Sequence, residues 1–575
     1  MNLIVPLVLP QTAAAVPTSA SSARRVLGLF WLLMFIAWPG FRAHALRGNV
    51  GAHDPSTIVK DGNKYWVFTT GPGIPSKYST DLLHWTAASR SVFTVATRPG
   101  WIAGKVPGFV NEYWAPECVF MNGKFYLYYS CSTFGSKVSG IGLATNVTLD
   151  PASPNYNWVD EGEVISSNAS SSSNAIDPAV YRDASNNVWF IYGSFFGGIR
   201  LFQLDATTGK PLSGAPQYVV ANGNVEAAYV KQRGSFYYLF INRGNCCQGA
   251  NSTYYMQVGR STSPSGPFLD KNGANLNNNG GSSLLSTAGR YIGPGHAGIF
   301  EENGVNYFSH HYYDGDDGGA PKLDISRLTW DADEWPVVSR NWVAPGRYTV
   351  ANTGSSLRWE AQGCAAATNL RIVQNAGSGL ACQLWDVTTL GDNVYQLVNV
   401  LTGQSAGTEN CATTSGSALQ MEPTSGSICQ EFRLERAIDG SFIVSFFGRP
   451  VEAAAASTAA GAQLQLGSYS AGSASQRWLL AQASPLAVAS SPKLTGVSMY
   501  PVPAERGAFT IELGAAKSAE ATTVQVFNSL GQLVRRQVYE PQQTKLAVAA
   551  GLAPGIYQVR VQRGNAAVTQ KQTVQ

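Results

Sequence analysis

The chain has 575 residues, of which 13% are charged and 11% are aromatic, and its formal net charge is +4. A length well above about 300 residues predicts several domains, and few charges with many aromatic residues exclude a disordered chain. The small net charge, without a long basic run, argues against nucleic acid as a partner.

Residues 1–45 have the pattern of an export signal. Arg24 and Arg25 precede the apolar run VLGLFWLLMFIAWPGF, and AHA at 43–45 offers a small-residue cleavage site. The run is about 16 residues long, shorter than the roughly 20 of a membrane span. An uncleaved membrane anchor is the alternative interpretation. Export would permit disulfide bonds.

Short aromatic strands are expected throughout residues 48–340. KYWVFTTG, KFYLYYSC, NVWFIYGSF, SFYYLFINR and VNYFSHHYYD each follow a polar turn such as KDGN or MNGK. Recurring turn–strand units predict an all-β ring of small sheets, as in a β-propeller. On this pattern alone, a β-sandwich is the alternative.

Three acidic residues precede or open such strands: Asp54 in HDPS, Asp177 in IDPAV and Glu226 in VEAAY. Asp-Pro alone is often no more than a turn. In a propeller, however, the first strand of each sheet lines the central axis, so the three carboxyl groups would converge. Convergent buried carboxyl groups shift their pKa values apart, which suits glycoside hydrolysis by one acid and one base.

These three boxes, in this order, resemble the catalytic boxes of glycoside hydrolase family 43, whose members are five-bladed β-propellers. The resemblance covers residues 48–340 and implies an inverting enzyme. Asp54 would be the general base and Glu226 the general acid, while Asp177 would orient the acid and raise its pKa. Further stretches are similar to the endo-arabinanases of the family, namely WAPE (114–117), GSFFGGI (193–199), NRGNCCQGANSTYYMQVGRS (242–261), SGPFLDKNG (265–273) and GPGHAGIF (293–300).

The same resemblance suggests residues that contact sugar and an ion. His296, in GPGHAG, is expected to help hold a calcium or other ion in the propeller channel, with water as the other ligands. Calcium prefers oxygen ligands, so one histidine cannot form the site alone, and a hydrogen-bonding core histidine is the alternative. The residues expected to contact substrate are His53, Trp114, Asn174, Ser194 and Phe195.

Two positions depart from the family pattern. Ala228 stands where relatives have proline, and Glu117 stands where they have aspartate. The longer Glu117 side chain is expected near the substrate cleft, where it could alter a subsite. Neither departure removes a catalytic carboxyl group.

Four cysteines lie in the first part of the chain. Cys246 and Cys247 stand where the similar arabinanases carry a cysteine pair, which implies a vicinal disulfide in an exported loop. Cys118 and Cys131 flank one predicted hairpin, and the sequence does not distinguish a bridge from two buried thiols there.

Residues 345–482 contain three repeats. CQLW at 382, CQEF at 429 and SQRW at 475 recur after 47 and 46 residues, and Cys364, Cys411 and Ser457 precede them by 18 residues. Because serine replaces both cysteines of the third repeat together, the pattern predicts a disulfide within each of the first two. The repeats resemble a ricin-type β-trefoil. No acidic residue follows the first cysteine position, so sugar binding and a spacer role both remain open.

Residues 494–575, after a linker at 483–493, alternate like the strands of a small β-sandwich. They resemble the C-terminal sorting domain of the type IX (Por) secretion system. YPVP at 500–503 departs from the usual Tyr-Pro-Asn-Pro at Val502. A generic adhesive sandwich is the alternative.

Together these features predict an all-β, exported endo-arabinanase, secreted or bound to the cell surface after passage through the periplasm. Its expected partners are arabinan or arabino-oligosaccharides and the type IX machinery, and a monomer is expected. An exo-acting α-L-arabinofuranosidase or β-xylosidase and a non-catalytic glycan-binding protein are the alternatives.

Overall fold

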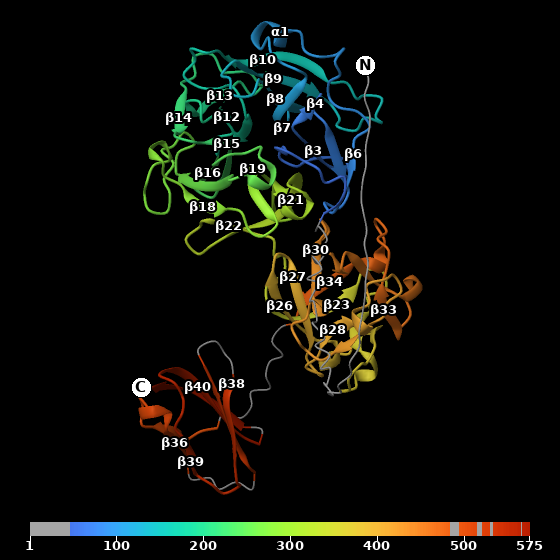
Figure 1. Ribbon diagram of the computed structural model, residues 1–575, viewed down its shortest axis with the longest axis vertical. Helices are drawn as coiled ribbons and strands as arrows, with labels where there is room; N and C mark the ends of the chain where they lie inside the picture. Colours follow the sequence, from blue (N-terminus) through green and yellow to red (C-terminus); the bar gives the residue numbers. More distant parts are fainter. Residues whose placement is uncertain (1–45, 484–493, 515–519, 529–532, 565) are drawn as a thin grey trace, which may run out of the picture. The chain divides into compact units, whose positions relative to one another are not determined.

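The structure, a computed structural model, is all-β, as predicted (Figure 1). It describes residues 46–483, 494–514, 520–528, 533–564 and 566–575. The predicted export signal (1–45) and nearly all of the predicted linker (483–493) lie outside these ranges. In the described part, no helix is long and apolar enough to cross a membrane. One short α-helix is present there, α1 (Trp101–Lys105).

Single 3-10 turns make up the other helical segments of the described chain. They are η1 (Gly249–Asn251), η2 (Leu276–Asn278), η3 (Gly315–Asp317), η4 (Gln362–Cys364), η5 (Ala381–Gln383), η6 (Glu409–Cys411), η7 (Ile428–Gln430), η8 (Ala454–Ala456), η9 (Ala474–Gln476) and η10 (Glu505–Gly507).

Five sheets follow one another along residues 47–339, and each is built from consecutive strands except that the short β4, which lies between β3 and β5 in the chain, pairs with the second sheet. The first contains β1 (Arg47–Gly48), β2 (Val59–Asp61), β3 (Lys64–Phe68), β5 (Ser76–Ser79) and β6 (His84–Ala87). The second contains β4 (Gly71–Pro72), β7 (Glu112–Met121), β8 (Lys124–Cys131), β9 (Ser139–Asn146) and β10 (Val159–Ser167).

The remaining three sheets have four strands each. The third contains β11 (Ala179–Arg182), β12 (Val188–Ser194), β13 (Gly198–Leu204) and β14 (Tyr218–Ala221). The fourth contains β15 (Glu226–Arg233), β16 (Phe236–Arg243), β17 (Tyr255–Ser261) and β18 (Ser282–Leu285). The fifth contains β19 (Tyr291–Glu302), β20 (Val305–Asp314), β21 (Ala320–Trp330) and β22 (Pro336–Ser339).

Neighbouring sheets share apolar cores, and these shared cores close the sheets into a ring. One cluster joins sheets one and two, another joins two and three, and a third spans sheets three to five. Sheet five returns to sheet one, where Tyr307 and Leu323 pack with Tyr65 and Val67. The aromatic strands seen in the sequence supply these clusters, because alternate side chains point to opposite faces of a sheet.

Twelve strands of the repeat region form a single sheet. They are β23 (Gly346–Asn352), β24 (Arg358–Ala361), β25 (Ile372–Asn375), β26 (Trp385–Gly391), β27 (Val394–Asn399), β28 (Ser405–Thr408), β29 (Leu419–Glu422), β30 (Phe432–Arg436), β31 (Phe442–Phe446), β32 (Arg449–Ala453), β33 (Ala462–Leu466) and β34 (Trp478–Gln482).

The repeat motif of this region is a packing motif. Trp385, Phe432 and Trp478 end the three motifs, and all three side chains are completely buried in one core. Both predicted within-repeat disulfides, Cys364–Cys382 and Cys411–Cys429, are present. The repeats were therefore interpreted correctly from their spacing.

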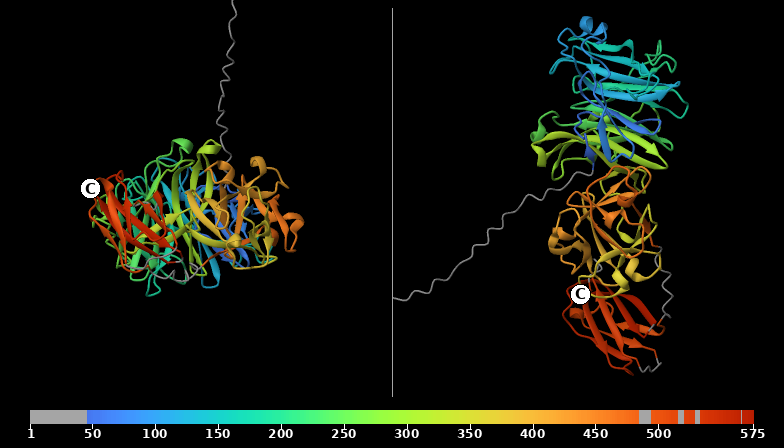
Figure 2. Two further views of the ribbon diagram at one scale, coloured as in Figure 1. Left: turned by 90° about the horizontal axis from the view of Figure 1, so that it is seen from below. Right: turned by 90° about the vertical axis from the view of Figure 1, so that its right-hand side faces the viewer.

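Two facing sheets form the C-terminal region (Figure 2). One contains β35 (Val497–Tyr500), β36 (Phe509–Leu513) and β39 (Lys545–Val548), and the other contains β37 (Thr522–Phe527), β38 (Leu533–Tyr539), β40 (Gly555–Arg563) and β41 (Ala566–Val574). Ile511 and Leu546 from the first sheet share a core with Val526 and Val559 from the second. This is the predicted sandwich.

Candidate active site

Each of the five sheets in the ring has a non-glycine residue with a left-handed backbone in its first long strand or in the segment that leads into it. These residues are Asp54 (φ 42°), Ala115 (39°), Asp177 (57°), Ala227 (52°) and His296 (61°). Such angles are unfavourable for residues with a Cβ and occur preferentially at functional sites. In the second, fourth and fifth sheets the strand pairing is interrupted at the same place. The same unfavourable backbone angle thus recurs in all five sheets, which indicates that these five residues belong to one functional site.

Asp54 lies between two sets of side-chain partners. Its Oδ2 accepts hydrogen bonds from His53 Nδ1 at 2.8 Å and Thr70 Oγ1 at 2.9 Å. Its Oδ1 lies 3.6 Å from His296 Nδ1 and 3.5 Å from His311 Nδ1, distances too long for strong hydrogen bonds. Burial alone would raise the pKa of Asp54, but the neighbouring His53 and His296 lower it well below its ordinary value. Asp54 is therefore ionised at neutral pH, and Oδ1 is left for another partner.

Asp177 and Glu226 form an interacting pair of carboxyl groups. The backbone N–H of Ala227 donates to Asp177 Oδ2 at 3.1 Å, and the backbone N–H of Asp177 donates to Ser130 Oγ at 3.0 Å. Burial raises the pKa of Asp177 to about 6. Burial, and then the negative charge of Asp177, raise the pKa of Glu226 to about 8, while a hydrogen bond with Tyr254 opposes the rise. Glu226 is therefore protonated at neutral pH.

His296 is buried at the same site. Its backbone N–H donates to Asn242 Oδ1 at 3.2 Å. Burial disfavours its charged form, but Asp54 and Asp177 together raise its pKa to about 8. The Asn242 side chain also donates to the carbonyl oxygens of Pro294 and Tyr255. Since Asn242 is paired with Glu226 across the sheet, it links the strand of His296 to the strand of Glu226.

Glu117 has a different role from the one we expected. Its carboxylate accepts hydrogen bonds from the backbone N–H and the hydroxyl of Thr57, at 2.9 and 2.8 Å. The side chain is buried, and burial raises its pKa to about 7. Glu117 thus joins the first two sheets, and its oxygens are taken by Thr57 instead of extending a subsite.

The residues predicted to contact substrate differ in exposure. The Asn174 side chain donates to Ser194 Oγ at 3.2 Å, and both side chains are buried. Phe195 is 49% exposed and lies against Phe196, while Trp114 is half-buried. Only His53, of the five predicted residues, is hydrogen-bonded to one of the three predicted catalytic acids among the described contacts.

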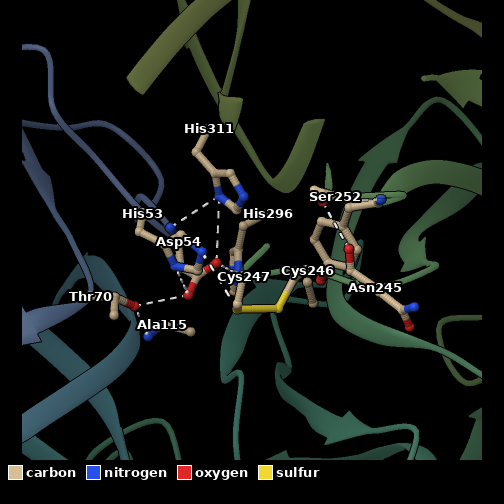
Figure 3. Close-up of a disulfide and its surroundings, with 12 residues drawn as sticks. His53, Asp54, Thr70, Ala115, Asn245, Cys246, Cys247, Ser252, His296 and His311 are labelled. Carbon is tan, nitrogen blue, oxygen red and sulfur yellow. Dashed lines mark hydrogen bonds and ion pairs between the residues drawn. A yellow bond between two sulfur atoms is a disulfide. The ribbon is translucent and has the colours of Figure 1, made fainter. Parts of the chain in front are cut away.

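The predicted vicinal disulfide is present and lies beside His53 and Asp54 (Figure 3). It joins Cys246 to Cys247, in the loop between β16 and β17. Cys247 Sγ is 3.8 Å from His53 Nε2. Cys118 and Cys131, which the sequence left undecided, are two separate buried thiols.

Several residues of the site could not be selected from the sequence. They are Thr70, Asn242, Tyr254, His311 and Tyr313, which contact Asp54, Glu226, His296 or His53. The alternation in VNYFSHHYYD does put His311 and Tyr313 on one face of a strand. Nothing in the sequence indicates, however, that this face meets Asp54.

Comparison with known proteins agrees with this geometry. Residues 48–336 match glycosyl hydrolases family 43, residues 331–422 and 381–466 match the ricin-type beta-trefoil lectin domain-like family, and residues 498–575 match the secretion system C-terminal sorting domain. The C-terminal match and the extracellular relatives described next mark the chain as secreted or displayed at the cell surface.

Two relatives cover the catalytic region. The extracellular exo-alpha-(1->5)-L-arabinofuranosidase ArbA of Cellvibrio japonicus is 38% identical over 304 residues, which are 50% of this chain and 86% of the relative. The extracellular endo-alpha-(1->5)-L-arabinanase 1 of Bacillus subtilis is 39% identical over 292 residues, 49% of this chain and 86% of the relative.

Among solved structures, the Cellvibrio cellulosa alpha-L-arabinanase complexed with arabinohexaose is 38% identical. It matches 50% of this chain and 95% of its own chain, with a TM-score of 0.48. The family match over residues 48–336, together with the identities to the two extracellular relatives, establishes that the chain belongs to glycosyl hydrolases family 43 and is a glycoside hydrolase.

Proposed function

We propose that this protein is an exported, inverting endo-arabinanase that cleaves α-1,5-L-arabinofuranosidic bonds in the arabinan side chains of pectin. The five sheets would be the blades of a propeller, followed by a β-trefoil and the sorting sandwich. The names of the two relatives support arabinan as the substrate, since both act on α-(1→5)-linked L-arabinose units.

One feature supports the catalytic part of this proposal: the surroundings of two carboxyl groups of the same site shift their pKa values in opposite directions. Asp54 has a pKa well below its ordinary value, and Glu226 has a pKa of about 8. A glycosidase needs one ionised and one protonated carboxyl group on opposite sides of the scissile bond. The opposite pKa shifts of Asp54 and Glu226 suit these two roles.

In the proposed reaction, Asp54 Oδ1 accepts a proton from a water molecule as that water attacks the anomeric carbon. The bond between this carbon and the leaving oxygen breaks, and Glu226 gives its proton to the leaving oxygen. The anomeric carbon is inverted in this single displacement. Asp177 accepts the Ala227 N–H and keeps its charge close to Glu226, which holds the acid protonated until it is needed.

We also propose which residues contact the sugar units on either side of the cleaved bond. Phe195, with its exposed ring, is proposed to stack on a sugar ring, and Trp114 to do the same where it is exposed. Asn174 and Ser194 would bind sugar hydroxyls after exchanging their mutual hydrogen bond. His53 would lie at the sugar that is cleaved. Endo action is proposed because the cysteine pair and GPGHAG resemble endo-arabinanases, while exo action is the alternative because one relative is exo-acting.

We propose that any ion near His296 is bound mainly by water molecules and by few protein ligands. The ligand atoms of His53, Asp54 and His311 lie within 4.8 Å of one another, and His296 is beside them. This set offers imidazole nitrogens and a single carboxylate, whereas calcium prefers six to eight oxygens. The donors therefore do not form a calcium cage, and no step of the reaction is assigned to an ion. Metal analysis of the purified protein, before and after chelation, tests this proposal.

The repeat region and the C-terminal sandwich are proposed to bring the catalytic region to its substrate outside the cell. The C-terminal sandwich would be read by the type IX secretion machinery during passage from the periplasm. The trefoil would hold the catalytic region near polysaccharide or act as a spacer. A monomer is proposed, and its mass in solution by light scattering tests this.

The experiment is a product profile from linear, debranched arabinan. We expect arabino-oligosaccharides of several lengths from the first minutes of reaction, and no products with Glu226→Gln. Release of arabinose or one fixed oligosaccharide alone would favour the exo alternative. Activity on xylo-oligosaccharides but not on arabinan would replace the substrate assignment.

A further inference from the structure

Three consecutive hydrogen bonds lead from the vicinal disulfide to Asp54. The backbone N–H of Cys247 donates to Tyr313 Oη at 2.7 Å. Tyr313 Oη lies 2.8 Å from His53 Nε2, and His53 Nδ1 lies 2.8 Å from Asp54 Oδ2. All four residues are therefore connected by bonds of ordinary, strong length.

Tyr313 Oη accepts the N–H of Cys247 and keeps a second lone pair and its own proton. It can therefore donate to Nε2 of a neutral His53 or accept Nε2–H of a protonated His53, and in both cases His53 Nδ1 carries a proton. A neutral imidazole that accepts at one nitrogen carries its proton on the other. Nδ1–H of His53 then donates to Asp54 Oδ2. The relay fixes both the rotamer and the tautomer of His53, and it leaves Asp54 Oδ1 for water.

Strand β20 holds His53 and Asp54 from one side. His311 Nδ1 accepts the backbone N–H of Asp54 at 3.1 Å, and its ring stacks on the ring of His53 with centroids 4.5 Å apart. Tyr313, two residues further along the strand, is almost completely buried. Both ring nitrogens of His53 are thus used inside the protein, which suits a positioning residue better than a substrate contact.

The loop that carries Cys247 is anchored at its base without the disulfide. Asn245 accepts from Ser252 Oγ and from the backbone N–H of Thr253, at 2.8 and 3.1 Å. Beyond this base, the vicinal disulfide joins Cys246 to Cys247, and a 3-10 turn follows at Gly249–Asn251. Cys247 has a left-handed backbone (φ 62°), an angle that a residue with a Cβ does not favour. The bridge thus closes the backbone at the residue whose N–H donates to Tyr313.

We propose, on the basis of the proposed function, that Tyr313 and the Cys246–Cys247 bridge position the general base. They act through His53, which they hold so that its Nδ1–H orients Asp54. The vicinal disulfide is then part of the catalytic geometry, in addition to shaping the rim of the site.

Kinetics on linear arabinan test the relay. Tyr313→Phe keeps the buried ring and removes the shared hydroxyl. Because misplacing a catalytic group by about 1 Å can cost about 10²-fold, we expect kcat to fall by about 10- to 100-fold while KM changes by less than about two-fold. The double variant Cys246→Ser/Cys247→Ser should lower kcat in the same way.

The triple variant distinguishes a relay from two independent effects. Residues that act as one unit give non-additive losses, so the triple variant should be no slower than the slower parent. Tyr128→Phe is the matched control, since Tyr128 is also fully buried and donates to the Gly209 carbonyl at 2.9 Å. Its melting temperature should fall about as much as that of Tyr313→Phe, with kcat unchanged.

Two readouts do not depend on arabinan. The chain has eight cysteines, so the three bridges leave two thiols in denaturant without reductant. Long-range ¹H–¹⁵N spectra of the six histidines, with His53 assigned through His53→Gln, should show Nδ1–H in the wild type. The His53 signals should move in Tyr313→Phe and in the double serine variant, and not in Tyr128→Phe.

The experiments distinguish a failure of the proposed function from a failure of the relay. A wild type without activity on arabinan contradicts the proposed function, and the His53 spectra still decide the relay. Unmoved His53 signals in Tyr313→Phe, additive kinetic losses, or a raised KM with kcat unchanged would overturn the relay. Four thiols in denaturant would remove the disulfide from it.

Discussion

The backbone N–H of Ala227 donates to Oδ2 of Asp177 at 3.1 Å. The residue that follows Glu226 is thereby held on a carboxylate from the preceding sheet. This bond sets the position of Glu226 relative to the charge that raises its pKa. Asp177 therefore contributes both to the orientation of the proposed acid and, after burial, to its raised pKa.

Replacing Asp177 by asparagine should move the basic limb of the pH profile to lower pH. The amide oxygen of Asp177→Asn can still accept the Ala227 N–H, so the geometry is kept while the negative charge is lost. Burial is the larger cause of the raised pKa of Glu226, and the charge of Asp177 is the next. Without that charge, the pKa of Glu226 falls from about 8 towards its ordinary value. The measurement is kcat/KM against pH.

The control for this variant is Asp205→Asn, which removes a partly exposed carboxylate just after β13 of the same sheet. Asp205 accepts hydrogen bonds from the backbone N–H groups of Thr207 and Thr208 in a turn. The basic limb of the pH profile of Asp205→Asn should therefore stay where it is in the wild type. A basic limb that is unchanged in Asp177→Asn would mean that Asp177 acts only by orientation.

Asp54→Asn should abolish turnover and leave binding intact. The amide keeps nearly the shape of the carboxylate but cannot take a proton from water, and a positioned base typically contributes about 10²–10⁴-fold. We expect kcat to fall at least that far, with the affinity for arabino-oligosaccharides, measured by calorimetry, changed little. A variant with the wild-type rate would end the assignment of Asp54 as the base.

Asn242→Ala should reduce both stability and rate. Asn242 is buried, donates to two carbonyl oxygens and accepts the N–H of His296. Leaving such buried groups without partners costs about 1–3 kcal/mol each. Because two of the three freed groups, the Pro294 carbonyl and the His296 N–H, belong to the strand of His296, kcat should fall as well. Denaturant unfolding and kinetics measure the two effects.

A matched asparagine in the repeat region distinguishes an effect on kcat from an effect on stability alone. Asn399 is fully buried and donates to the carbonyl oxygens of Cys382 and Leu384. Asn399→Ala should lower stability by a similar amount and leave kcat unchanged. An equal loss of kcat in both variants would show that Asn242 acts only through stability.

Removing the C-terminal region should affect export and not hydrolysis. The sandwich has its own core of apolar side chains from both of its sheets, and regions with separate cores usually fold independently. A chain of residues 46–490 should hydrolyse arabinan in solution at the full rate. In a host with type IX secretion, the truncated chain should remain in the periplasm, as cell fractionation would show. Loss of activity in solution would contradict the prediction that hydrolysis does not need the C-terminal region. Normal surface display of the truncated chain would contradict the prediction that export does need it.

The sequence predicts the strands and repeats well because these depend on local patterns. Turn residues before aromatic runs place β3, β8, β12, β16 and β20, and the replacement of paired cysteines by paired serines identifies the two disulfides of the repeat region. The order of the acidic boxes finds Asp54, Asp177 and Glu226 as candidates.

The contacts around those acids depend on ring closure, which the sequence does not display. His311 and Tyr313 reach His53 and Asp54 only because sheet five returns to sheet one. For the same reason the sequence could not show that Glu117 is bound to Thr57 on the neighbouring sheet. The left-handed backbone at Ala115 and Ala227 is equally hidden, since alanine has no special preference for it.

The central claim is that Asp54 and Glu226 catalyse a single displacement at the anomeric carbon of an α-L-arabinofuranosyl unit. Proton NMR of the reaction on linear arabinan, recorded before the products change anomer in water, tests it most directly. We predict that the newly formed reducing ends are β-anomers, because single displacement inverts the configuration. New ends that are α-anomers would mean retention through a covalent intermediate and would contradict the assigned roles of both residues.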